Sequence, residues 1–327
     1  MRGFLILFFG LLAHNGHAAL PGALPPDTLR PTSSVRRLRY TYANDLFFRT
    51  DYYFTQGMTL ALVHPALARS PVNHLLLRGP AGATRYHGIT LRYDGFTPLR
   101  IQDAFIRMGD RPYAAYLYAS FFRTSRAPLG HQRLTTAVEV GFIGPAAGGK
   151  QLQTSIHRIT GNAEPRSWDY QIGPATVLGY RVAYERKLLT ASRFAEVHGT
   201  TEASLSTLYT YASAGAQLRV GRLHPEQDDQ WGGSTEPAAQ HWRLHAQAAI
   251  EGRLVGYDAT LQGGIFSRRD PYTLATSQIR RAVLRSSGGV VVGHGNCQLA
   301  ATATWVTSEF AGSRSHRWGQ LGLTVGF

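Results

Sequence analysis

The sequence contains a single cysteine, Cys297, among its 327 residues. One thiol cannot close an internal disulfide, so the fold must be held together by side-chain packing and backbone pairing. Beyond residue 20 there is no run of 18 apolar residues, which excludes a transmembrane helix in that part of the chain. The motifs G-x-S-x-G, H-E-x-x-H and C-x-x-C are also missing. A hydrolase with this sequence would therefore use water, rather than a motif serine, as its attacking group.

Acidic residues are scarce as well. The chain has 20 aspartates and glutamates against 34 lysines and arginines, which gives a formal net charge of +14. A basic protein suits phosphate-bearing partners, either nucleic acid or an anionic lipid surface. Arginine far outnumbers lysine, and its forked guanidinium matches phosphate well.

The first residues predict export. Arg2 precedes a short apolar run from Phe4 to Ala13, and Gly16 and Ala18 supply small residues for a cleavage site. This pattern indicates a secretory signal peptide over residues 1–18, followed by a mature domain at 19–327. Export argues against nucleic acid, so the basic charge points to an anionic lipid surface, unless it only reflects a generally basic proteome.

The remainder of the chain alternates apolar with polar or small residues, as strands do. In the last segment, HRWGQLGLTVGF, Leu321, Leu323, Val325 and Phe327 fall on one face. A soluble sandwich and a membrane barrel both alternate in this way. Export, the aromatic residues near the predicted strand ends and the final phenylalanine favour a membrane barrel, whose strands carry aromatic girdles at both interfaces.

We therefore predict an all-β fold, a transmembrane antiparallel barrel of about twelve strands, an even number as in bacterial barrels. The predicted strands cover 36–46, 57–65, 86–96, 112–124, 132–143, 175–189, 194–206, 208–222, 241–255, 284–293, 296–308 and 316–327. The long intervals 66–85, 144–174, 223–240 and 256–283 are predicted to be extracellular loops, where functional residues concentrate.

One loop has helical spacing. In KQLQTSIHRITG, residues 150–161, an apolar stripe is formed by Leu152, Ile156 and Ile159. Gln153 and His157 lie one turn apart on a neighbouring face, and Gly161 suits a helix C-cap. Taken alone, His157 is either a surface histidine of this loop or a functional group held against the barrel rim.

A second group of polar residues lies in YTYANDLFFRTDYYFTQG, residues 40–57. Asn44 and Asp45 could supply oxygens to calcium, or could orient a histidine and an acyl carbonyl. They could equally form a simple turn. Further on, Asp110 and Arg111 form either a possible ion pair or a structural turn before a strand.

Several short blocks occur together in a characteristic order. They are AND at 43–45, YFTQG at 53–57, GDRPYAAYLY at 109–118, GFIGPAAGG at 141–149, HRITG at 157–161, WDYQI at 168–172, ATLQGG at 259–264 and VTSEF at 306–310. In these blocks and their spacing the chain resembles the outer-membrane lipid A 3′-O-deacylases of the LpxR type, and the likeness covers nearly all of the mature chain.

The resemblance implies a twelve-stranded barrel that removes the 3′-linked acyloxyacyl group of lipid A by calcium-dependent ester hydrolysis. It assigns His157 as the base that activates water, Asn44 and Asp45 as the polar pair beside it and as calcium ligands, and Thr55 as a hydroxyl contact.

Two further assignments depart from the family pattern. The family has an acid six residues after the histidine, where this chain has Ala163, so a one-residue shift would give that role to Glu164. Arg100 is the nearest candidate for binding a lipid A phosphate.

The resemblance also implies lipid A, within lipopolysaccharide, as the partner, the bacterial outer membrane as the location and a monomer as the working unit. Two alternatives remain at this stage. The chain could be a non-enzymatic barrel, serving as a pore or a surface-binding protein, or it could be another lipid hydrolase such as a phospholipase.

Overall fold

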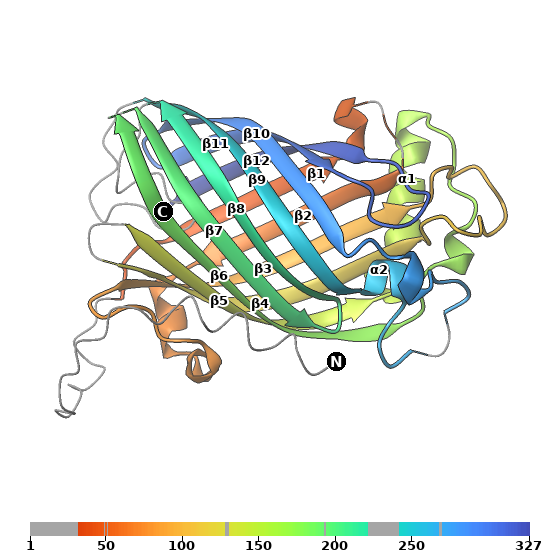
Figure 1. Cartoon of the computed structure of the whole chain (residues 1–327), viewed down its shortest axis with the longest axis horizontal. Coiled ribbons are helices and arrows are strands. Elements are labelled where there is room, and N and C mark those ends of the chain that lie inside the picture. Colours follow the sequence, from red (N-terminus) through yellow and green to blue (C-terminus); the bar gives the residue numbers. More distant parts are fainter. Residues whose placement is uncertain are drawn as a thin grey trace. The chain divides into compact units, whose positions relative to one another are not determined.

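The computed structural model describes residues 32–48, 50, 52–127, 131–192, 194–221, 242–267 and 270–327. The predicted signal peptide, residues 1–18, lies outside this described part. Within it, the strands form one antiparallel sheet that closes on itself as a barrel (Figure 1). The strands are β1 Arg37–Asn44, β2 Tyr53–Val63, β3 Thr84–Thr97, β4 Ala114–Arg126, β5 Gln132–Ile143, β6 Ala175–Ser192, β7 Ala195–Ser206, β8 Tyr209–Gly221, β9 Arg243–Asp258, β10 Ala282–His294, β11 Cys297–Val306 and β12 His316–Gly326.

The predicted all-β barrel is confirmed, and each of the twelve predicted strands overlaps one in the structure. Neighbours in sequence pair with each other, and β1 pairs with β12 to close the sheet, with Arg37 opposite Gly326 and Asn44 opposite Gly319. Closure leaves the sheet without an open edge, which is what a strand-built protein needs in lipid. No helix among the described residues is long and apolar enough to cross a membrane.

Alternation along each strand separates an outer face from a lumen face. On β12, Leu321, Leu323 and Val325 are exposed on the outer face, as predicted. On β1 the exposed Leu38 and Tyr40 share that face, whereas the buried Thr41 and Ala43 point inward. The outer wall is thus apolar over most of its strands, and the lumen receives the polar side chains.

The connections divide between the two ends of the barrel. At one end of the barrel β1, β3, β5, β7, β9 and β11 finish, and the fully described connections there are 98–113, 144–174, 207–208 and 307–315. At the other end β1 begins and β12 finishes, and the fully described connections there are 64–83 and 295–296. Because extracellular loops of such barrels are the longer ones, we assign the first end to the cell exterior.

Two of the four predicted extracellular loops, 66–85 and 223–240, are not confirmed. The prediction for 66–85 is wrong, because this segment joins β2 to β3 at the end where β1 begins and β12 finishes. Successive turns of an up-and-down barrel alternate between its ends, so the side of a single loop follows from its place in the strand order and not from its own length. The interval 223–240 lies outside the described residues.

The helices are short and mostly lie in the connections. They are α1 Gly149–Thr160, α2 Ala259–Gln262 and the 3-10 turns η2 Asp45–Phe48, η3 Pro65–Arg69, η4 Pro71–Leu75, η6 Pro145–Ala147, η7 Trp168–Tyr170 and η8 Thr276–Gln278. The predicted loop helix is α1, at the right-hand end of Figure 1. Gly161 ends α1 with φ of 71°, a left-handed conformation that suits glycine, so the predicted C-cap is confirmed.

Candidate functional site

Asn44 stands on the outer face of the barrel wall. It is the last residue of β1 and has the same strand parity as the exposed Leu38 and Tyr40. Its Nδ2 donates to the Tyr42 hydroxyl at 3.1 Å, and its Oδ1 accepts the backbone N–H of Leu46 at 2.7 Å. The amide is thus oriented at the rim of the wall on the side that meets lipid.

Asp45 follows Asn44 and begins the 3-10 turn η2. Its side chain is buried, with Oδ2 accepting the backbone N–H of Tyr52 at 3.1 Å. Its carbonyl accepts from both the backbone N–H and the hydroxyl of Thr50. The turn that was predicted as the alternative for Asn44 and Asp45 therefore does form.

Thr55 reaches the same outer face through an irregularity in β2. Pairing with β3 shifts register between Phe54 and Gln56, so that Thr55 is an extra residue. A bulge of this kind re-aims a side chain and is common near functional sites. The Thr55 methyl group lies close to Gly95, and Gln56 is the cross-strand partner of Asn44. The bulge therefore sets Thr55 beside Asn44.

The start of β2 also holds a strained residue. Tyr53 has φ of 68°, which is unusual for a bulky side chain and costs on the order of 1–3 kcal/mol. Its buried ring packs edge-on against Phe310 and His316, and its hydroxyl accepts the backbone N–H of Arg314 at 3.3 Å. This packing holds the conformation that precedes the bulge.

Helix α1 docks on the outer wall through a polar face. Its buried residues are Gly149, Gln153 and His157, spaced by one turn. Gln153 Nε2 donates to Thr55 Oγ1 at 3.3 Å, and Gln153 Oε1 accepts from Trp168 Nε1 at 2.7 Å. Both bonds are buried, so Gln153 links the helix directly to the β2 bulge.

The apolar stripe of α1 is not its docking face, since Ile159 is 85% exposed and Leu152 and Ile156 are half-buried. The wall beneath is itself partly polar, so hydrogen-bonding side chains face it. Glycine is required at position 149, where α1 comes close to the wall, because a Cβ there would lie 2.6 Å from the Trp168 ring and 2.7 Å from Ala115.

His157 is buried and held by one defined contact. Its Nδ1 lies 2.6 Å from the carbonyl oxygen of Ala163. A carbonyl only accepts, so Nδ1 carries the proton in this contact, and a neutral ring then has its lone pair on Nε2. The described residues provide no hydrogen-bond partner for Nε2. This is the arrangement of a histidine prepared to accept a proton.

The other two predicted site residues lie elsewhere. The Glu164 side chain is 59% exposed, and its carboxylate lies 3.7 Å from the guanidinium of Arg158, which is 71% exposed. The contact with the His157 ring comes instead from the backbone of Ala163. Arg100 is exposed in the connection from β3 to β4, which packs against the segment after α1 through a bond from Arg166 N–H to the Ile101 carbonyl.

The structure thus brings three of the predicted residues to one face. Asn44 and Thr55 stand on adjoining strands, and Gln153 ties the helix of His157 to Thr55. Sequence reasoning missed Trp168, which orients Gln153, and Tyr93, whose hydroxyl accepts from Gln56 at 3.3 Å. Trp168 is the first residue of the WDYQI block, so the resemblance to the family could have pointed to it. Tyr93 lies in none of the quoted blocks, and nothing in the sequence signalled its role.

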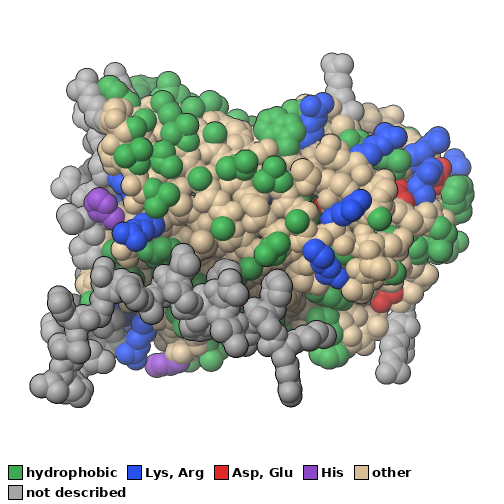
Figure 2. Space-filling view, viewed as in Figure 1, with side chains coloured by type: hydrophobic (Ala, Val, Ile, Leu, Met, Phe, Trp, Pro, Cys, Tyr) green, Lys and Arg blue, Asp and Glu red, His purple; other side chains and the backbone are tan. Residues whose placement is uncertain are grey.

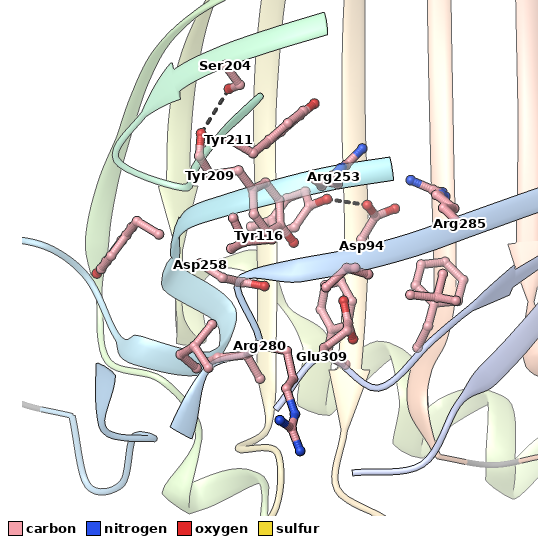
Figure 3. Close-up of a pocket in the computed structure, with 18 of the residues that line it drawn as sticks. Asp94, Tyr116, Ser204, Tyr209, Tyr211, Arg253, Asp258, Arg280, Arg285 and Glu309 are labelled. Atoms are coloured by element: carbon pink, nitrogen blue, oxygen red, sulfur yellow. Dashed lines mark hydrogen bonds between the residues drawn. The ribbon is translucent and has the colours of Figure 1, made fainter. Parts of the chain in front are cut away.

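A second polar region lies inside the barrel. A cavity of about 510 Å³ is lined by lumen-facing side chains, including Asp94, Tyr116, Arg253 and Glu309 (Figure 3). Its charges largely neutralise one another, since Arg92 contacts Asp94 at 2.8 Å and Arg181 contacts Glu139 at 3.1 Å. These paired groups line the lumen and lie on the opposite side of the wall from Asn44.

The lumen network reaches the exterior end through Arg111. Its guanidinium is fully buried and contacts Glu309 at 2.6 Å and Thr260 Oγ1 at 3.0 Å. Burial acts to raise the pKa of Glu309, but the charge of Arg111, together with those of His316 and Arg285 and the hydrogen bond from Arg111, holds that pKa below its ordinary value. The possible Asp110–Arg111 side-chain pair is therefore wrong, because Asp110 accepts backbone N–H groups, including that of Leu99 at 2.8 Å.

The donors for a metal are limited. No group of three or more histidine, cysteine, aspartate or glutamate side chains suited to a metal occurs within the described ranges. Asn44 and Asp45 offer oxygens of the type that calcium prefers, and each of these oxygens can accept more than the one N–H bond described. The pair fits calcium in chemistry, but backbone carbonyls, water or substrate would have to complete six to eight ligands.

Comparison with known proteins gives one clear result. The sequence profile of the family described as "Outer membrane protein LpxR" matches residues 4–327. Among solved structures, LpxR from Salmonella typhimurium is similar with a TM-score of 0.71 and 20% identity, covering 89% of this chain and 100% of that one. The beta domain of the Bordetella autotransporter BrkA reaches a TM-score of 0.43 and 11% identity, with 90% and 100% covered. No curated protein matches significantly.

Proposed function

The chain belongs to the LpxR family of outer-membrane proteins, and from the geometry of the site on its outer wall we propose that it hydrolyses the 3′-linked acyloxyacyl ester of lipid A. The observation that carries the proposal is the position of the polar groups. Asn44 and Thr55 lie on the lipid-facing side of the wall, with the helix of His157 docked against Thr55. A lipid can reach this place from the outer leaflet without entering the lumen.

In the proposed reaction, His157 Nε2 accepts a proton from water while the water oxygen attacks the ester carbonyl. The tetrahedral species then collapses, the sugar oxygen leaves, and the proton on His157 passes to that oxygen. The Ala163 carbonyl holds the ring through Nδ1 and stabilises the positive charge that develops. General base action of this kind contributes roughly 10²–10⁴-fold to the rate.

Glu164 is assigned a weaker part than the resemblance implies. Its exposed side chain and loose contact with Arg158 give it no direct hold on the His157 ring. We propose that the Ala163 carbonyl supplies the orientation that an acid would otherwise give. Thr55, in turn, positions the helix by accepting from Gln153.

Calcium is proposed as the cofactor, held by Asn44 and Asp45. When bound, it would supply positive charge to the oxyanion that forms as the ester is attacked. The two side chains contribute in addition a fixed turn at the rim, through the bonds from Leu46 and Tyr52.

Basic side chains at the exterior end support the choice of a phosphorylated lipid. On the face in Figure 2, lysine and arginine side chains are more numerous toward the right-hand end, where α1 lies. Arg100 is exposed in a connection at this end and is proposed to bind a lipid A phosphate.

The test is mass spectrometry of lipid A from cells that express the protein. The proposal expects loss of the 3′-linked acyl pair with the wild-type chain and no loss with His157→Gln. Release of a phospholipid chain instead would favour the phospholipase alternative. An unchanged lipid profile, together with ion conductance of the purified barrel, would favour the pore.

A further inference from the structure

The outer wall carries a shallow apolar groove on the other side of η2 from α1. It has a volume of about 380 Å³ and is lined by Phe47, Phe48 and outer-wall residues of β10, β11 and β12. The strands that form it follow β1 around the barrel in the order β12, β11, β10. The groove therefore begins directly beside the strand that ends in Asn44.

Small side chains form the floor of the groove at the level of Asn44. Asn44 pairs with Gly319, Gly319 with Ala303 and Ala303 with Gly288, so these residues form one row across the sheet. At a spacing of about 4.8 Å per strand, the row extends roughly 14 Å from Asn44. The next row toward the membrane centre holds the exposed Val290 and Leu321, which border the recessed floor.

Two phenylalanines of η2 form the wall of the groove nearest the site. The Phe47 ring covers Gly319, where a Cβ would come within 2.7 Å of the ring. Phe48 lies 6.0 Å from Trp305 between ring centroids, and the guanidinium of Arg317 stands 4.9 Å above the Phe48 ring. Among the described residues Arg317 has no carboxylate partner. The groove is thus apolar along its length and has a cation at its outer rim.

We propose that this groove binds one acyl chain of the lipid substrate, a chain other than the one that is cleaved. The inference rests on the proposed function. An acyl chain is the occupant because the groove lies on the membrane-facing wall, and because its outer rim offers a cation to an anionic headgroup. A lipid with several chains can straddle η2, with one ester at His157 and another chain beside Phe47. A chain bound in the groove would then position the ester of the same lipid at His157.

The structure offers a substitution that fills the groove without distorting the sheet. A Cβ added at Gly288 meets no atom within 4 Å, so Gly288→Leu places a side chain in the groove itself. Gly252 on β9 gives a matched control. It lies between the exposed Ile250 and Leu254 on the outer face, outside the groove, and a Cβ there has only a backbone oxygen at 3.9 Å.

The first experiment measures binding without hydrolysis. The full-length protein and both variants are placed in phospholipid vesicles containing lipid A with a photoreactive group on an acyl chain that is not cleaved. After irradiation, the labelled peptides are identified by mass spectrometry. We expect labelling of β10–β12 in the wild type and in Gly252→Leu, a loss of at least about fivefold in Gly288→Leu, and competition by unlabelled lipid A.

A photoreactive phospholipid serves as the second probe. Equal labelling of the groove by this probe, without competition by lipid A, would identify the occupant as bulk membrane lipid and overturn the inference. Because neither probe requires turnover, the result is independent of whether the ester is hydrolysed.

Kinetics complete the test. Gly288→Leu should raise KM for lipid A roughly fivefold with little change in kcat, a modest effect because a chain leaving the groove returns to equally apolar lipid. A soluble single-chain ester should be hydrolysed equally by both variants. An unchanged KM in Gly288→Leu would contradict the inference, whereas absence of hydrolysis by the wild type would contradict the proposed function alone.

Discussion

Replacing Gln153 with leucine tests how the proposed base is positioned. The change removes the donor to Thr55 Oγ1 and the acceptor for Trp168 Nε1, both buried. Each polar group left without a partner costs about 1–3 kcal/mol, so the docked state of α1 loses roughly 2–6 kcal/mol. The substitution does not change the barrel strands, so the lost free energy weakens the docking of α1 and not the folding of the barrel.

We expect kcat/KM for lipid A to fall at least about tenfold in Gln153→Leu, since 1.4 kcal/mol corresponds to a factor of ten. Deacylation is followed by mass spectrometry of lipid A in vesicles, and folding is checked by heat-modified mobility on gels. Gln151→Leu is the matched control, because Gln151 is exposed on the same helix. Full activity in Gln153→Leu, with both variants folded, would refute the view that α1 must be held against the wall.

Further predictions concern the groups around the site and the lumen. Glu164→Gln should keep activity within about twofold, whereas Asn44→Ala should lower it at least about tenfold, both measured by release of fatty acid. A calcium chelator should stop the reaction, and calcium should restore it in the same assay. Glu309→Gln should destabilise the barrel by about 3–5 kcal/mol in urea titration, because Arg111 is left buried and unpaired. The pKa of Glu309 is lower in the folded state than in the unfolded state. Its contribution to the free energy of unfolding is therefore present above the unfolded pKa of about 4.3 and is lost as pH falls through the folded pKa. The stability of Glu309→Gln should lack this part of the dependence on acid pH.

The strands could be predicted from sequence because an outer-membrane wall imposes a strict period of two. Leu321, Leu323 and Val325 alternate with smaller or polar residues since one face meets lipid and the other the lumen. The side on which a loop emerges could not be read from its length. The 64–83 connection is long, but it lies at the same end as the first residue of β1.

The site was predictable in its residues more than in its arrangement. His157, Asn44 and Thr55 came from the resemblance, but the bulge that turns Thr55 outward depends on pairing with β3. The docking face of α1 could not be read from its hydrophobic periodicity, because that pattern identifies a docking face only when the partner surface is apolar. Here Gln153 meets a hydroxyl and an indole N–H, which only the folded wall brings together.

The central claim is that His157 removes a proton from water at a lipid-facing site. Its most direct test is mass spectrometry of lipid A treated with the purified protein and with His157→Gln in water enriched in ¹⁸O. The account predicts release of the 3′-linked acyl group as a free acid that carries ¹⁸O with the wild type, and no release with the variant. Release of that group by folded His157→Gln at the wild-type rate would contradict it.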